Sequence, residues 1–320
     1  MFMNELLEKL FRISIIAGLG VKETIRKKLL FFLLISCIVF IATGAGCTNA
    51  CMGMTDSGME AQYIAKKEEI QSGNLPEKAE MLAQLEDQYR AVKKESGEKL
   101  TMVLSIVVFS ITGFWLFLIA AIFTPFTVMN DFDQRMHVMI LARPVSRTEF
   151  LVGKFSAILF VMLLNLVIML AASGILTYLS VGETGFVILK GMLIFLQGLA
   201  VFTSMMLFFS LVIGRLPAVF LGFVLPWLTV IPAISIINGD MTSELTLTNI
   251  FTYVFAYGLP QYSINYFYSL SFVIQDIDFL NNMHKIGNNT GIYSLFINTV
   301  WFGIFWGISI FILNKKDIET

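Results

Sequence analysis

Long uncharged apolar stretches alternate with shorter polar segments along most of the chain. Six of the stretches approach or exceed the length of about 20 residues with which an α-helix crosses a bilayer. They are residues 29–45, 102–126, 155–180, 186–213, 216–238 and 293–313. This pattern predicts an all-α integral membrane protein with six transmembrane helices.

A seventh apolar stretch, residues 250–273, has a different character. Gly258 and Pro260 interrupt it, and it is rich in tyrosine, which favours the boundary between lipid and water. Backbone that leaves a helix at membrane depth is tolerated only where protein or a watery cavity covers it. We therefore expect region 250–280 to form an outer re-entrant element before the last helix.

Two polar segments have helical patterns of their own. In residues 1–28, Leu6 and Leu10 recur at helical spacing opposite charged positions, which predicts a cytoplasmic helix lying in the headgroup layer. In residues 46–99, two runs of alternating charge flank a turn, which predicts an outer helical hairpin that extends the first two membrane helices. Its sparse apolar stripe comprises Tyr63, Ile70, Met81, Leu85, Tyr89 and Val92.

Composition supports this class, and charge orients it. The chain has 320 residues, of which 57% are hydrophobic and only 14% are charged. Basic residues precede the first stretch and follow the last, so the positive-inside rule places both termini in the cytoplasm. Segment 46–99 is then extracytoplasmic, the other five helices lie within 100–313, and 314–320 is a cytoplasmic tail. With this topology the inner segments carry a net charge of +5 and the outer segments −6.

Several kinds of chemistry are excluded. A net charge of −1 does not suit a nucleic-acid binder, and three cysteines are too few for an iron–sulfur cluster held by one chain. The chain lacks a phosphate-binding Gly-x4-Gly-Lys-Ser/Thr loop, so it does not hydrolyse ATP itself. The six stretches contain almost no acidic residue or histidine, and Asn165 and Gln197 are their main polar insertions. We expect neither an enzyme nor a cofactor bound by this chain.

Cys47 and Cys51 form, with nearby methionines, the one cluster of soft metal ligands. Three interpretations remain open. The two cysteines could form a disulfide in an oxidising outer compartment, have no role, or bind Cu(I). We expect both cysteines to be dispensable for assembly.

The polar loop between the second and third stretches predicts a short amphipathic helix over residues 130–143. Asn130 suits the N-cap, Asp131 and Asp133 suit the first turn, and Pro144 ends the helix. The next four residues, 146–149, have the form of a capping box that opens the third stretch.

The sequence from Pro144 to Phe155 also resembles a family signature, which here comprises Pro144, Ser146, Arg147, Gly153 and Lys154. It is similar to the signature of type-2 ABC exporter permeases, the transmembrane subunits of ABC transporters. The likeness is greatest to the branch that includes the membrane subunit of the nitrous-oxide-reductase maturation transporter. Asp133 stands near the acidic position of that family, whereas Arg135 and Met136 replace its Gly-Thr pair.

The resemblance implies an exporter subunit in the cell inner membrane, surrounded by lipid. A separate ABC ATPase would supply energy from ATP and Mg, and a second copy or a related permease would complete the pathway as a homodimer or heterodimer. Helix 130–143 would couple the two subunits through Asp131, Phe132, Asp133, Arg135 and Met136. Tyr262, Tyr266 and Phe267 would form an outer gate.

Two other functions remain open at this point. The hairpin at 59–99 suits a subunit that transmits force to an extracytoplasmic protein, or a scaffold for one. An ion-coupled secondary transporter is the other alternative, although the apolar stretches lack the ionisable residues that such proteins use.

The topology makes a direct prediction for labelling in intact cells. In a variant without native cysteines, cysteines at Ser96 and Asn288 should react with an impermeant thiol reagent applied from outside. A cysteine at Ser146 should react only after the membrane is opened. Labelling of position 146 from outside would overturn the orientation.

Overall fold

Every secondary-structure element that the structure describes is an α-helix, as predicted. The computed structural model describes residues 2–26, 29–72, 78–133, 146–181, 188–238, 250, 254, 259–271 and 287–315. Its helices are α1 (Phe2–Arg26), α2 (Leu29–Ser72), α3 (Lys78–Asp133), α5 (Arg147–Val181), α6 (Ile188–Ile213), α7 (Arg215–Asn238), α9 (Tyr262–Ser271) and α11 (Gly287–Lys315).

The described residues of the six predicted apolar stretches lie in six different helices. Within the described residues, four segments are long and apolar enough to cross a bilayer, and they lie in α3, α5, α6 and α11. They are Phe109–Met129, Arg147–Ile168, Leu193–Ile213 and Tyr293–Lys315. In α7 the apolar segment Arg215–Val230 is shorter, and the stretch at 29–45 begins α2.

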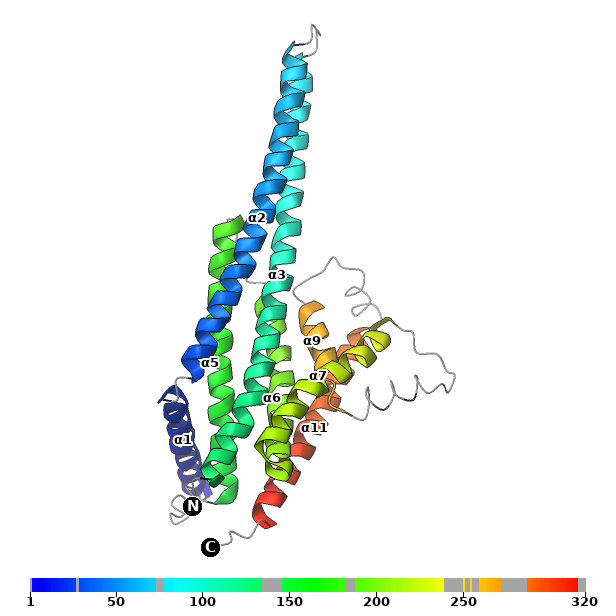
Figure 1. Cartoon of the computed structure of the whole chain (residues 1–320). Coiled ribbons are helices and arrows are strands. Elements are labelled where there is room, and N and C mark those ends of the chain that lie inside the picture. The colour runs from blue at the N-terminus through cyan, green and yellow to red at the C-terminus, as the bar shows by residue number, and fades with distance from the viewer. Residues whose placement is uncertain are drawn as a thin grey trace.

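The helices form an elongated body with a stalk (Figure 1). Helices α2 and α3 run side by side and project far beyond the body as an antiparallel hairpin. Helices α5, α6, α7 and α11 lie alongside their lower halves, and α9 is a short helix between α6, α7 and α11. The start of α5 and the end of α11 lie at the end of the body away from the stalk.

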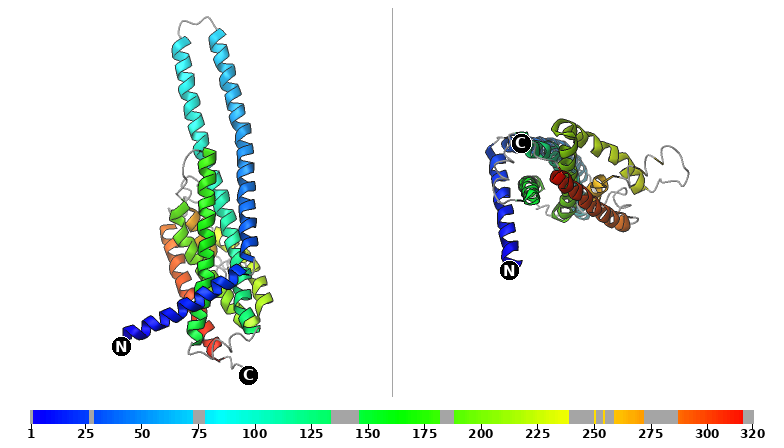
Figure 2. Two further views of the ribbon diagram at one scale, coloured as in Figure 1. Left: turned by 90° about the vertical axis from the view of Figure 1, so that its left-hand side faces the viewer. Right: turned by 90° about the horizontal axis from the view of Figure 1, so that it is seen from below.

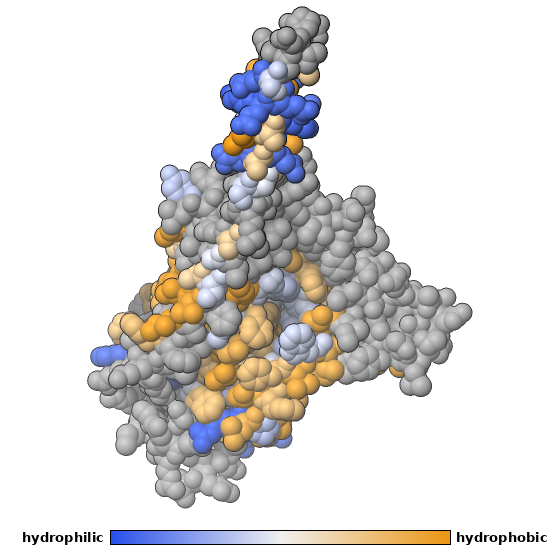
Figure 3. Space-filling model, turned by 45° about the horizontal axis from the view of Figure 1, so that its top comes forward, coloured by the Kyte–Doolittle hydropathy of each residue, from blue (hydrophilic) through white to orange (hydrophobic). Residues whose placement is uncertain are grey.

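The stalk consists of the unbroken continuations of α2 and α3 beyond the body. Tyr63 of α2 stacks on Tyr89 of α3, with ring centroids 4.4 Å apart, and Lys67 and Lys93 lie over these rings. Figure 3 shows its hydrophilic surface above an apolar body. Met81 and Val92, which belong to the predicted apolar stripe, are partly exposed at 39% and 48%. Because each helix has one neighbour, only part of a stripe is covered.

Helix α1 lies across α5 and projects past the body, as Figure 2 shows. A Cβ atom added to Gly153 would lie 2.6 Å from Cγ2 of Ile16, so this signature glycine permits the close approach of the two helices. Leu7 and Phe11 are 57% and 66% exposed, which leaves an apolar face of α1 without protein cover.

One local prediction was wrong. Helix α3 continues to Asp133, so Asn130 lies inside a helix instead of at the N-cap of a new one. The apolar periodicity of the membrane helix continues through Asn130, and one N-cap residue does not stop a helix that is already formed. Residues 134–145 lie outside the described residues, and so does most of the predicted helix 130–143.

Candidate functional site

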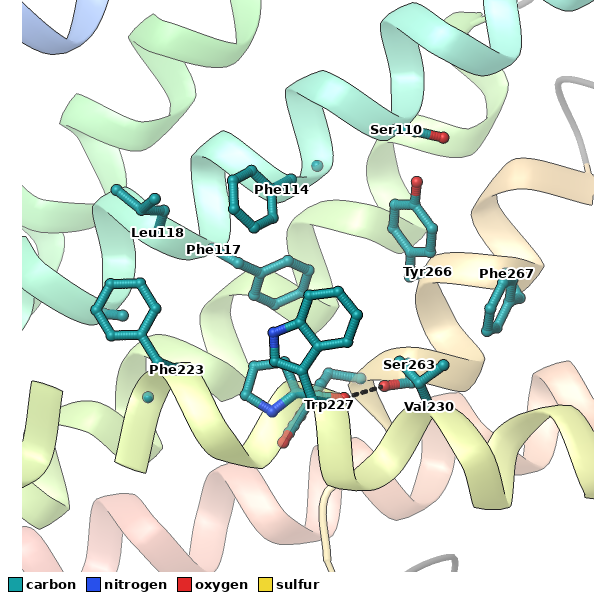
Figure 4. Close-up of a pocket in the computed structure, with 15 residues that line it drawn as sticks. Ser110, Phe114, Phe117, Leu118, Phe223, Trp227, Val230, Ser263, Tyr266 and Phe267 are labelled. Carbon is teal, nitrogen blue, oxygen red and sulfur yellow. Dashed lines mark hydrogen bonds between the residues drawn. The ribbon is translucent and has the colours of Figure 1, made fainter. Parts of the chain in front are cut away.

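An apolar pocket with a volume of about 230 Å³ lies between α3, α7 and α9. The three residues predicted to form an outer gate, Tyr262, Tyr266 and Phe267, all line it. Figure 4 shows Tyr266 and Phe267 on α9 beside this pocket. The facing walls include Phe114, Phe117 and Leu118 of α3 and Phe223, Trp227 and Val230 of α7. The structure thus adds two walls that the sequence did not assign to the gate.

Two glycines allow α9 to pack closely against α3 and α6. A Cβ atom at Gly113 of α3 would lie 2.6 Å from Cε2 of Tyr266, so a larger residue would displace this ring. A Cβ atom at Gly191 of α6 would collide with the backbone carbonyl of Ser269. Small residues allow such close helix packing in membrane proteins.

Aromatic rings form the back of the pocket. The ring centroid of Tyr262 lies 6.0 Å from that of Phe117 and 5.6 Å from that of Phe202, and Tyr262 is almost fully buried. The ring centroid of Tyr266 lies 5.5 Å from that of Phe109. Offset and edge-on contacts of this kind add stability beyond the area that they bury.

A buried polar network holds the start of α9 on α11. The backbone N–H of Gln261 donates to Oδ1 of Asn298 at 2.7 Å. Ser294 Oγ donates to Oδ1 of Asn265 at 2.8 Å and lies 3.2 Å from the backbone carbonyl oxygen of Gln261. Asn265, Ser294 and Asn298 are fully buried. The network therefore satisfies backbone groups that the break before α9 leaves outside a helix.

Gln197 extends this network to α6. Its Nε2 donates to the backbone carbonyl of Leu295 at 2.9 Å and to Oγ1 of Thr299 at 2.8 Å. On the opposite side of α9, Ser263 Oγ lies 2.6 Å from Oγ1 of Thr229 in α7. Nδ2 of Asn265 in α9 donates to Oε1 of Gln197 at 3.5 Å. Hydrogen bonds thus join α9 to α6, α7 and α11.

The pocket is open on one side and carries no charge. Phe114 is 53% exposed and Trp227 is 67% exposed, and none of the described residues that line the pocket is ionised at neutral pH. The arrangement suits contact with an apolar group, a lipid chain or another protein surface.

The signature residues that the structure describes lie in the first turns of α5, at the end of the body away from the stalk (Figure 1). The predicted capping box is confirmed, because the Ser146 N–H donates to Oε2 of Glu149 at 2.9 Å and the Glu149 N–H donates to Oγ of Ser146 at 3.2 Å. Arg147 Nη1 donates to the backbone carbonyls of Leu313 and Asn314 in α11. Lys154 is buried, with its Nζ over the ring of Phe150.

The residues predicted to contact an ATPase lie only partly within the described residues. Asp131, Phe132 and Asp133 form the last turn of α3, whereas Arg135, Met136 and Pro144 lie outside the described residues. Cys47 and Cys51 are one turn apart in α2. The disulfide, the copper site and the absence of a role all stay predictions.

The polar network itself was missed, although the sequence carries a signal for it. Gln261, Asn265 and Ser269 recur every four residues, and Ser294 and Asn298 have the same spacing in an apolar helix. Polar stripes of this kind on membrane segments indicate contact between helices. Asn165, the other noted polar insertion, donates to Val161 O of its own helix.

Comparison with known proteins gives one match. Residues 14–318, which are nearly the whole chain, match the family model described as ABC-2 family transporter protein. No curated protein and no solved structure matches the chain.

The polar network predicts a stability difference between two asparagines of α11. Asn298→Ala should lower the free energy of unfolding by about 1–2 kcal/mol, because the buried Gln261 N–H loses its acceptor. Asn314→Ala, which removes an exposed side chain from the same helix, serves as the matched control. Unfolding in mixed micelles measures both, and equal losses would contradict the assigned role of Asn298.

Proposed function

The chain belongs to the ABC-2 transporter family as a multi-pass, non-catalytic membrane subunit, and from this premise we propose that it forms the translocation pathway of an ATP-driven exporter. Membrane subunits of this family work with ATPase subunits, and ATP and Mg are bound there. An ion-coupled secondary transporter does not fit the family.

The open pocket is the observation that carries the proposed pathway. Its walls on α3 and α7 expose Phe114, Phe223 and Trp227, which are 53%, 39% and 67% accessible in one copy of the chain. A second copy related by a two-fold axis would cover this face and enclose a path between the two pockets. We assign the gate to Tyr262, Tyr266 and Phe267, and an apolar or amphiphilic substrate fits the uncharged lining.

We also propose that six helices cross the membrane with both termini in the cytoplasm. Helices α2, α3, α5, α6, α7 and α11 run alternately up and down the body (Figure 1). Helix α5 starts and helix α11 ends at the same end of the body, and this end would then be cytoplasmic. Helix α1 would lie in the headgroup layer of the cytoplasmic leaflet. The stalk would be extracytoplasmic, and α9 would belong to a re-entrant element in region 250–280.

The ATPase would bind at the loop that follows α3. Residues 130–143 carry apolar and charged positions suited to a cleft and its rim, and the capping box at Ser146–Glu149 joins the loop directly to α5. Asp131, Phe132, Asp133, Arg135 and Met136 are the proposed contact residues.

A second function, transmission of force to an extracytoplasmic protein, is favoured by the length of α3. This helix has 56 residues and runs from the stalk to the proposed ATPase end. At 1.5 Å per residue it is about 84 Å long. The proposed likeness to the membrane subunit of the nitrous-oxide-reductase maturation transporter suits this use of the stalk.

The proposed coupling predicts which variants lose the ATPase. From native membranes, the tagged chain should co-purify with an ABC ATPase in stoichiometric amount. Phe132→Ala should weaken this binding by about tenfold or more, because aromatic anchors dominate protein interfaces. Joint reversal of charge at Asp133 and Arg135 should weaken it less.

Phe11→Ala is the matched control, since Phe11 is an exposed phenylalanine of α1 at the same end of the body. The coupling role would be wrong if the Phe132 and charge-reversal variants bound the ATPase as the control does. The exporter function itself would be wrong if the unchanged chain recovered no ATPase.

A further inference from the structure

Arg147 links the beginning of α5 to the end of α11. Its Nη1 atom donates to the carbonyl oxygens of Leu313 at 2.9 Å and Asn314 at 3.0 Å. Carbonyls in the last turn of a helix have no partner within that helix, and a cation there complements the helix dipole. The two helix ends therefore form one joint, 166 residues apart in sequence.

Helix α11 continues from this joint to the polar network without interruption. Its 29 residues include no proline. Asn298 precedes Leu313 by four helical turns, so the two positions are about 22 Å apart along the axis. Between them Phe305 packs on Phe208 of α6, and Trp306 packs on Phe155 of α5.

At its other end, α11 holds the first turn of α9. Asn298 accepts the N–H of Gln261, and Ser294 contacts both Gln261 and Asn265. The next residue after Gln261 is Tyr262, which lines the pocket, and Tyr266 lies one turn further on. A shift of α11 along its axis therefore displaces the wall that α9 contributes.

From these contacts we propose that α11 is a connecting element, with Arg147 as its inner joint and Asn298 as its outer joint. Movement at the start of α5 is carried along α11 to α9 and changes the accessibility of the pocket. Arg147 is a positioning residue in this scheme, because it bonds the end of α11 and does not line the pocket. The inference rests on the proposed function only in that the ATPase would bind next to the start of α5.

A purely structural role for Arg147 gives a different expectation. As a simple cap it would stabilise the end of α11, and its loss would lower the melting temperature without changing the pocket. The decisive readout is therefore the accessibility of the pocket, measured together with thermal stability.

The test uses the full chain alone in lipid nanodiscs, with Cys37, Cys47 and Cys51 replaced by serine and a reporter thiol introduced by Val230→Cys. Val230 lines the pocket from α7, outside the proposed connection. The rate of its modification by a small maleimide is measured for Arg147→Gln, for Asn298→Ala and for the double variant. Each single change should alter the rate about threefold or more.

The double variant should match the larger single effect, because both changes break the same connection. Arg215→Gln is the control, since Arg215 lies at the same end of the body over the ring of Phe126. It should leave the rate unchanged. Arg147→Lys keeps the charge and should give a smaller effect than Arg147→Gln, and it replaces that variant if Arg147→Gln does not fold.

Two results would overturn the proposal. One is an unchanged rate in the Arg147 variants, and the other is additivity of the Arg147 and Asn298 effects on a logarithmic scale. Since no ATPase is present, a failure here is distinct from a failure of the exporter function.

Discussion

The hydrogen bond from the Gln261 N–H to Asn298 is the interaction on which the position of the pocket depends. Residues 259–261, just before α9, are not helical, and a buried backbone polar group needs a partner within the protein. Asn298 and Ser294 provide these partners from α11, and Gln197 joins the same network from α6. Because the start of α9 is fixed in this way, Tyr262 and Tyr266 face α3 and α7 instead of the lipid.

The same segment combines two kinds of contact with different physical character. Hydrogen bonds join α9 to α6, α7 and α11. Gly113 and Phe109 of α3 contact α9 through the ring of Tyr266. Directional bonds set the register of α9 along its neighbours, whereas ring contacts tolerate sliding. A short helix held like this suits a gate, because its position follows the helices to which it is bonded. Because Arg147 bonds the far end of α11, the position of α9 also depends on the start of α5.

Much of the fold was predictable because helix length and helix caps depend on residues that are consecutive in the sequence. The six apolar stretches, the continuous stalk helices and the capping box at Ser146–Glu149 follow from such patterns. The pocket was only half predictable, since tyrosines beside a break marked α9 but not its neighbours. In a membrane protein, apolar residues face both lipid and other helices, so periodicity alone does not identify Phe114 or Trp227 as a wall. The exposure of Met81 and the helical position of Asn130 have the same origin, because each depends on what packs against the helix.

The central claim is that two copies face each other across α3, α7 and α9 and enclose the pathway there. The most direct test is oxidative cross-linking in native membranes of a chain without native cysteines that carries Trp227→Cys. The account predicts a covalent dimer at this position. It predicts none for Phe160→Cys, an exposed aromatic position on α5, which lies on the other side of the body from α7 (Figure 1). Cross-linking at position 160 with none at position 227 would contradict the claim.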